Sequence, residues 1–373
     1  MQPPDMSYLT DIYFGWGRVA RVSEILEKLG GKRPLVITDR GLAGLGMVER
    51  LGLGQPQVFD RLETNPTEKN ARAALEAYYQ NSCDSIVALG GGSPIDLAKI
   101  VGLLASHPGP LEQYAILRGG VSRISGSLPP LVAVPTTAGS GSEVGRAALL
   151  TLESGDKLGF LSPHLLPGAA VCDPELTLSM PSALTAGSGM DALAHCVEAF
   201  LSPRWNPLAE AIALDGLERG FGSIRAAVND GRDRPAREAM LLASLEAGLA
   251  FQKGLGAVHS LSHPLGALSD RRLHHGTLNG IFLPHVLEFN YSACPEKFER
   301  LAALLGAKSG SDLPELFADL LSELGLPMRL SELGLQAEDL TPLAEKAFRD
   351  HCTPTNPRPL TVEDSLELYL KAL

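Results

Sequence analysis

The chain lacks the features that would bind nucleic acid or cross a membrane. None of its 373 residues lies in an uninterrupted apolar stretch of about 18 residues, the minimum for a membrane-spanning helix. Lys and Arg (32) are outnumbered by Asp and Glu (43), and no basic run is present that could follow a phosphate backbone. The N-terminus also lacks the basic and then apolar order of an export signal. We therefore expect no nucleic-acid partner and no membrane association.

Cysteine is scarce as well. The five cysteines are odd in number, scattered, and never spaced as C-x-x-C, so they indicate neither a disulfide framework nor a thiolate zinc cluster. This usage favours a reducing, cytoplasmic location. Hydrophobic residues make up 45% of the chain and charged residues 20%, which is enough apolar material for a sizeable core. The length leaves room for two domains.

Short β-rich runs alternate with helical patterns in the first half of the chain. Strands are predicted at residues 34–38, 57–59, 85–89 and 131–135, and helices at 67–79 and 94–104. This alternation predicts an α/β, Rossmann-like domain with a parallel sheet. Residues 41–51 suggest a helix or turn, and residues 158–171 a two-stranded excursion.

The second half has a different character. Beyond Pro181, Ala, Leu, Glu and Gly dominate and no β-branched strand is expected, which predicts an all-helical domain. We place the domains at residues 1–180 and 181–373, with Ser182 as the expected cap of the first helix of the second domain.

Two small-residue loops are candidates for dinucleotide binding. The run GGGSP at residues 90–94 follows a buried strand and opens a helix, so its backbone N–H groups could approach a pyrophosphate; the alternative is a tight turn. The hydroxyl-rich run PTTAGSGSE at residues 135–143 follows another strand. Asp39 ends the first strand, where a carboxylate would accept from the adenosine ribose of NAD, unless it is only a solvated turn residue.

Histidines and one aspartate have spacings typical of a metal site. Asp191 and His195 are four residues apart, as are His259 and His263, so on helices each pair would share a face. A further pair follows at residues 274–275. One carboxylate with two or three imidazoles suits Fe²⁺, Zn²⁺ or a similar divalent ion. A single helical histidine is more often structural, but two pairs and a third cluster favour a metal. The spacing alone does not decide whether His259 or His263 binds the metal directly, or whether His274 or His275 does.

These motifs resemble those of the iron-containing (group III) alcohol dehydrogenases. The resemblance rests on residues 90–99, 135–143, 189–195 and 259–276, followed by Pro-His at 284–285, and it is collinear from about Tyr13 to residues 356–359. It implies a dehydroquinate synthase-like fold, in which an N-terminal domain binds NAD(P) and a helical C-terminal domain binds the metal. It also implies a homodimer.

The resemblance assigns residues to roles. It implies metal ligation by Asp191, His195, His259 and His275, with His263 as a non-ligating catalytic histidine that relays a proton. The cofactor-binding residues it implies are Asp39 and Asn65 near the adenosine, Gly91, Gly92 and Ser93 at the pyrophosphate, Asp96 near the nicotinamide ribose, and Thr136, Thr137 and Lys157 toward the nicotinamide. One departure is a spacer between His263 and His275 about two residues longer than in many members.

The expected activity is that of a metal-dependent NAD-linked alcohol dehydrogenase or aldehyde reductase, with hydride transfer between a metal-bound alcohol and nicotinamide C4. Its partner would be a small alcohol or aldehyde. Asp39 favours NAD, while the adjacent Arg40 would allow some use of NADP. The alternatives are a maleylacetate reductase-like enzyme, against which Asp191 argues because that branch typically has Asn there, and an NAD-using metal-dependent lyase or cyclase. A third alternative is a metallohydrolase in which the glycine loop is only a turn; such an enzyme would bind no dinucleotide.

Overall fold

The computed structural model describes residues 10–62, 65–268, 271 and 273–373, which form two compact units. The N-terminal unit comprises the described part of Ser7–Thr137 together with Gly141–Ser179. The C-terminal unit comprises Ala138–Ser140 and the described part of Met180–Leu373. Among the described residues, every helix is too short or too polar to span a bilayer.

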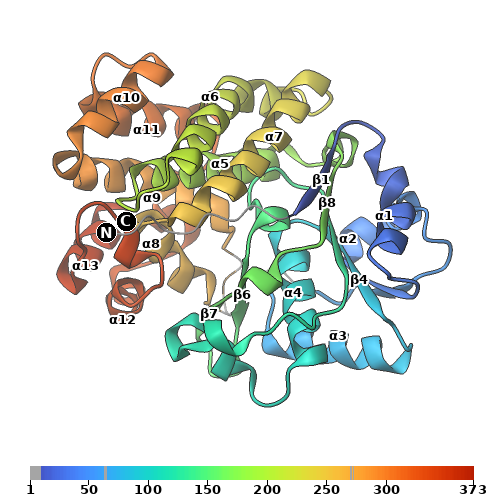
Figure 1. The fold of residues 1–373 in the computed structure, drawn as a ribbon. Helices are drawn as coiled ribbons and strands as arrows, with labels where there is room; N and C mark the ends of the chain where they lie inside the picture. The colour runs from blue at the N-terminus through green and yellow to red at the C-terminus, as the bar shows by residue number, and fades with distance from the viewer. Residues whose placement is uncertain (1–9, 63–64, 269–270, 272) are drawn as a thin grey trace. The chain divides into compact units, whose positions relative to one another are not determined.

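The N-terminal unit is built on a six-stranded sheet (Figure 1). The strand order in this sheet is β1-β8-β5-β4-β2-β3. Its strands are β1 (Asp11–Phe14), β2 (Pro34–Ile37), β3 (Gln57–Phe59), β4 (Ser85–Gly90), β5 (Leu131–Pro135) and β8 (Ala169–Cys172). Each neighbouring pair is parallel. The predicted parallel α/β sheet and its four predicted strands are therefore confirmed.

Helices cover both faces of this sheet, which explains the continuous apolar strands. Leu35 and Ile37 of β2 belong to one core cluster, which includes residues of α3 (Glu68–Gln80) and α4 (Gly92–Ser106). Val36, between them, belongs to a second cluster with α1 (Val22–Lys28). Side chains alternate between the faces of a strand, so a strand buried on both faces has no polar position.

One expectation about this unit is wrong, one is confirmed, and one strand was missed. The two-stranded excursion predicted at residues 158–171 is wrong: the antiparallel hairpin pairs β6 (Ala147–Thr151) with β7 (Lys157–Leu161), and β8 lies in the main sheet. Residues 41–51, expected to form a helix or turn, contain the rest of α2 (Arg40–Gly44), a turn and a 3-10 helix at Glu49–Leu51, so this expectation is confirmed. Strand β1 was not predicted, because it is a short edge strand of four residues, two of which are exposed.

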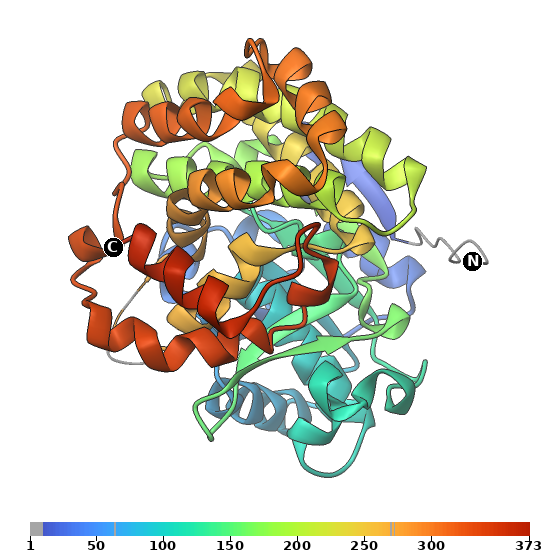
Figure 2. The ribbon, with the colours of Figure 1, turned by 90° about the vertical axis from the view of Figure 1, so that its left-hand side faces the viewer.

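The C-terminal unit is helical, and its described residues contain no strand. Its helices are α5 (Ser182–Leu201), α6 (Pro207–Asn229), α7 (Arg234–Ala250), α8 (Ala257–Gly266), α9 (His275–Asn290), α10 (Pro295–Leu305), α11 (Leu313–Glu323), α12 (Ala337–Phe348) and α13 (Val362–Lys371). Helix α5 packs against α6, α7 and α9 and is buried along most of its length. Within this unit, α10 and α11 lie at one end, and α12 and α13 at the other (Figures 1 and 2).

Helix α5 begins without the predicted serine cap, and a lysine side chain binds the carbonyl groups at its other end. Thr185 N donates to Pro181 O at 2.9 Å, so Pro181 precedes the helix and Ser182 is already its first residue. At the other end, the fully buried Lys253 ammonium donates to carbonyl groups of residues 199, 200 and 202 at 2.6–3.0 Å. A cation is favourable there because the unpaired carbonyls give the helix C-terminus a negative end.

Candidate metal centre and cofactor loops

The glycine-rich loop joins β4 to the N-terminus of α4. Gly90 has φ 147°, a backbone conformation that favours glycine, and a Cβ there would lie 2.5 Å from Pro94 Cγ. A Cβ on Gly91, the N-cap residue, would lie 2.9 Å from Thr137 Oγ1. No described side chain caps this 15-residue helix. Gly92 and Ser93, in its first turn, therefore present backbone N–H groups and a positive helix end suited to a pyrophosphate.

The other predicted cofactor loops lie at the same edge of the sheet. Strands β2, β4 and β5 are parallel neighbours, so Asp39, the glycine loop and Thr136 all follow carboxyl ends of adjacent strands. Asp39 caps α2 by accepting from Leu42 N at 3.0 Å. Thr136 N donates to Gly90 O at 3.0 Å, which ties the two loops together.

Asn65 and Lys157, far apart in sequence, meet in the structure. Lys157 Nζ donates to Asn65 Oδ1 at 3.0 Å, and Asn65 has φ 61°. The position of Asn65 in the left-handed region is one that asparagine tolerates better than most residues. The resemblance had assigned these residues to different halves of the dinucleotide.

The carboxylate of Asp96, predicted to lie near the nicotinamide ribose, accepts hydrogen bonds from two groups of the protein. Its Oδ1 accepts from Ser142 Oγ at 2.6 Å and its Oδ2 from Leu149 N at 3.0 Å, and burial raises its pKa. Nearby, burial lowers the pKa of Lys99 to about 8, and Lys99 Nζ donates to Ser142 O and Gly145 O at 2.7 and 2.8 Å. These bonds fix the shape of the hydroxyl-rich loop.

Asp191 on α5 is the hub of the predicted metal centre. Its Oδ1 lies 3.8 Å from His195 Nδ1, 3.7 Å from His259 Nε2 and 3.7 Å from His275 Nε2. The three imidazoles come from α5, α8 and α9, so one carboxylate oxygen has nitrogen atoms from three helices around it. Burial opposes ionisation of Asp191, but His195 and His275 hold its pKa far below the usual range.

The arrangement fits a divalent ion. Two ligands bound about 2.1 Å from one ion in tetrahedral geometry are separated by about 3.4 Å, close to the spacing of these atoms. His195 Nδ1 is buried and has no hydrogen-bond partner among the described residues, and burial lowers the pKa of His195 to about 4. A neutral imidazole with an unused nitrogen beside a carboxylate is the state that metal binding requires.

Glu198, which the sequence analysis missed, orients one of these histidines. Its Oε2 accepts from His259 Nδ1 and its Oε1 accepts from Val258 N at 2.7 Å. Nε2 of His259 is thereby left to face Asp191. Burial disfavours the charged form of His259, but the carboxylates of Glu198 and Asp191 outweigh it and raise its pKa to about 9. Glu198 lies seven residues after Asp191 on α5, a spacing that could have indicated it.

Asn279 was also missed. Its Nδ2 donates to Asp191 Oδ1 at 2.7 Å and lies 3.1 Å from Nε2 of both His259 and His275. It lies four residues after His275 on α9 and therefore on the same helix face. The Asp191 oxygen and the two histidine nitrogens thus all lie within hydrogen-bond distance of Asn279 Nδ2.

A close approach of α5 and α9 brings His275 to Asp191. A Cβ on Gly276 would lie 2.1 Å from Gly187 O and 2.9 Å from Asp191 Cβ, so only glycine fits at this crossing. His274, the other candidate ligand, instead caps α9 through its Nδ1, which accepts from Thr277 N at 3.3 Å. The structure therefore brings His275, rather than His274, to the carboxylate.

His263 lies beside the metal ligands and bonds to a different carboxylate. Its Nδ1 is 3.0 Å from Asp350 Oδ2, and its ring is stacked with that of His275, with centroids 5.5 Å apart. Burial lowers the pKa of His263 to about 4. Burial works against ionisation of Asp350, yet His263 and His351 hold its pKa well below the usual range. Asp350 and His351, from the turn after α12, were not predicted.

One unit thus carries a dinucleotide-type sheet and the other a His–Asp centre, and comparisons with known proteins agree with this reading. The iron-containing alcohol dehydrogenase model matches residues 10–174, and the C-terminal model of the same family matches residues 185–373. The chain is 48% identical to 4-hydroxybutyrate dehydrogenase of Cupriavidus necator and 39% identical to 1,3-propanediol dehydrogenase of Citrobacter freundii, each over 96% of both chains.

Solved structures give the same result. A 1,3-propanediol oxidoreductase superposes with a TM-score of 0.92 at 38% identity, covering 99% of this chain and 100% of the other. The sulfoacetaldehyde reductase of Bifidobacterium kashiwanohense, solved with NAD⁺, has a TM-score of 0.89 at 28% identity, covering 100% and 99%. The chain belongs to the iron-containing alcohol dehydrogenase family. It is therefore an oxidoreductase of the NAD-linked, metal-dependent alcohol dehydrogenase class.

Proposed function

We propose that this chain interconverts a short primary alcohol and its aldehyde, with Asp191, His195, His259 and His275 as ligands of a divalent ion, Fe²⁺ before Zn²⁺. The observation that carries the proposal is the near-equal spacing of three imidazole nitrogens, 3.7–3.8 Å from Asp191 Oδ1. When bound, the ion supplies a Lewis acid for the substrate oxygen and NAD supplies the hydride acceptor.

The chain's own residues would position both groups and move the proton. The loop at Gly91, Gly92 and Ser93 would hold the pyrophosphate, and Asp39 the adenosine ribose. His263 would carry the proton: Asp350 accepts from its Nδ1, so Nε2 keeps the lone pair that a base needs. Because burial lowers the pKa of His263 to about 4, its imidazole is neutral at neutral pH.

The substrate we favour carries a second polar group at the far end of a short carbon chain. Two relatives have names of this kind, a 4-hydroxybutyrate dehydrogenase at 48% identity and a 1,3-propanediol dehydrogenase at 39%. We also propose a homodimer in the cytoplasm. All five cysteines are free, which supports a reducing compartment.

Steady-state assays on protein reconstituted with Fe²⁺ or Zn²⁺ test the activity. We expect NADH to accumulate with 4-hydroxybutyrate or 1,3-propanediol. A lyase or cyclase that uses NAD only transiently would give no net NADH, and that outcome with every alcohol in the panel would refute the proposal.

Metal analysis tests the ligands. Asp191→Ala and His195→Ala should lose tight metal binding and activity, since one of four ligands is gone, while the affinity for NAD stays within a few-fold. Glu246→Gln is a matched control in the same unit, because Glu246 lies beside Arg219 rather than the metal centre. Full metal occupancy in both ligand variants would contradict the assignment.

A further inference from the structure

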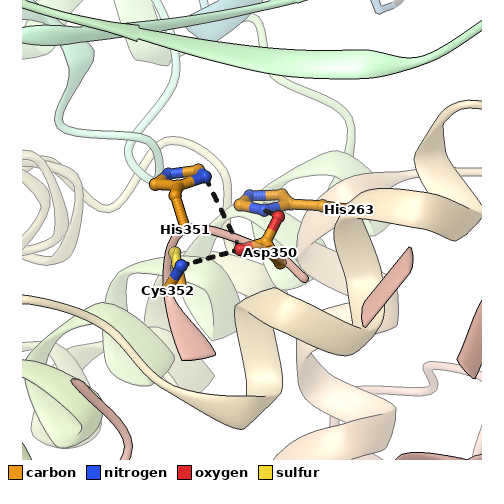
Figure 3. Close-up of side chains that lie close together, drawn as sticks. All are labelled: His263, Asp350, His351 and Cys352. Atoms are coloured by element: carbon orange, nitrogen blue, oxygen red, sulfur yellow. Dashed lines mark hydrogen bonds and ion pairs between the residues drawn. The ribbon is translucent and has the colours of Figure 1, made fainter. Parts of the chain in front are cut away.

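A second group of metal-type ligands lies on the turn that follows α12. Asp350, His351 and Cys352 are consecutive there, and His263 of α8 faces them (Figure 3). One donor atom from each of the four side chains can be chosen so that all lie within 4.8 Å of one another. None of the four is among the proposed ligands of the first centre.

The turn holds these donors in place. Asp350 N donates to Ala347 O at 3.1 Å, and Cys352 N donates to Asp350 Oδ1 at 2.9 Å. The Asp350 carboxylate lies between two imidazoles, with His263 Nδ1 3.0 Å from Oδ2 and His351 Nδ1 3.6 Å from Oδ1 (Figure 3). The two rings are nearly parallel, at 9°, with centroids 5.4 Å apart. The ligand set is therefore assembled without a large rearrangement.

We propose that His263, Asp350, His351 and Cys352 form a second divalent-cation site, distinct from the centre at Asp191. Two imidazoles, one carboxylate and one thiolate make up a mixed N, O and S set, which suits a borderline ion such as Zn²⁺ or Co²⁺ rather than Mg²⁺ or Ca²⁺. The His351 side chain is 22% exposed, so the site is open to solvent on that side.

Proton balance accompanies binding. An ionised carboxylate only accepts, so His263 Nδ1 carries a proton in its bond to Asp350. The ion takes the place of that proton on Nδ1 while Nε2 takes up one proton from solvent, so the imidazole stays neutral and releases no net proton. Cys352 binds as a thiolate and releases its proton to solvent.

Occupation of this site would regulate the enzyme. The ion engages the same histidine that we propose to carry the proton, so Zn²⁺ in excess of the first site should slow turnover; this consequence rests on the proposed function. The existence of the site does not, because it can be measured by binding alone.

The decisive experiment is titration of the metal-free full-length chain with Co²⁺, followed by equilibrium dialysis. We expect two ions per wild-type chain, one for His351→Ala, one for Asp191→Ala, and none for the double variant. His351→Phe keeps an aromatic ring against His263 and should also bind one ion, which guards against a folding defect in the alanine variant. His164→Ala removes an exposed imidazole of the N-terminal unit and should keep two.

The absorption spectrum identifies the thiolate. Wild-type and Asp191→Ala protein should show a sulfur-to-cobalt charge-transfer band, which Cys352→Ser should lose and Cys294→Ser should keep. Two ions retained by both His351 variants, or no ion bound by Asp191→Ala, would overturn the second site. Two ions in Asp191→Ala and one in His351→Ala would instead contradict the catalytic centre while supporting the second site.

Discussion

Glu198→Gln is a nearly isosteric change that tests how the protein prepares His259. Glu198 accepts two hydrogen bonds, from His259 Nδ1 and from Val258 N. A glutamine amide has one accepting oxygen, so it can satisfy only one of these two donors. If the oxygen stays at Val258, the amide N–H₂ faces His259 Nδ1 and forces the proton onto Nε2, the nitrogen that faces Asp191.

Both orientations have a measurable cost. The wrong tautomer of His259 should weaken metal binding about 10- to 100-fold, or about 1.4–2.7 kcal/mol. This is the usual cost of removing a carboxylate that orients a metal-ligating histidine. The opposite orientation leaves the buried Val258 N–H unpaired, which should lower the free energy of unfolding by about 1–3 kcal/mol. A measurable loss of metal affinity or of stability is therefore expected from a change of one atom.

The assays are competition for the ion against a chromophoric chelator and denaturant unfolding of the metal-free protein. Glu246→Gln serves as the control, since it changes another partly buried glutamate of the same unit without contacting the centre. Metal affinity within twofold of wild type, together with unchanged unfolding, would refute the reasoning about the tautomer.

Three further substitutions, the first of them with a control, test other contacts. Gly276→Ala should lower the free energy of unfolding by about 1–3 kcal/mol and reduce metal occupancy, because its Cβ would lie 2.1 Å from Gly187 O. The control is Gly222→Ala, since Gly222 is exposed on α6 and nothing lies near its Cβ. In denaturant unfolding the control should be neutral or more stable by up to about 1 kcal/mol. Gly91→Val should raise the NAD dissociation constant at least roughly tenfold by calorimetry, and unchanged affinity would make the loop a mere turn. Wild-type enzyme should prefer NAD over NADP by roughly 10- to 1000-fold in kcat/KM, and Asp39→Gly should narrow that ratio; a wild-type preference for NADP would show that Asp39 is not at the ribose.

Local patterns sufficed for the buried parallel strands and for the helical character of the second half. A strand such as β4, buried along its whole length, is an unbroken apolar run and is visible in the sequence. Strand β1 has two exposed residues in four, so its pattern carries little signal. The hairpin was misplaced because residues 158–171 contain two β-rich runs that do not pair with each other: β7 pairs with β6, which directly precedes it, whereas β8 pairs with β5 and with the distant β1.

The sequence by itself determined the parallel α/β sheet, the helical second half, and the residue types of the glycine-rich loop and of the proposed ligands of the first metal centre. Those features depend on periodicity and on spacing within single elements. Tertiary structure decided between His274 and His275, because one residue caps α9 and its neighbour begins it, which turns the two side chains in different directions. It also decided the roles of Glu198 and Asn279. Their partners lie 61 and 88 residues away in the chain, and only the packing of α5 against α9 and the neighbouring α8 brings such distant groups within hydrogen-bond distance.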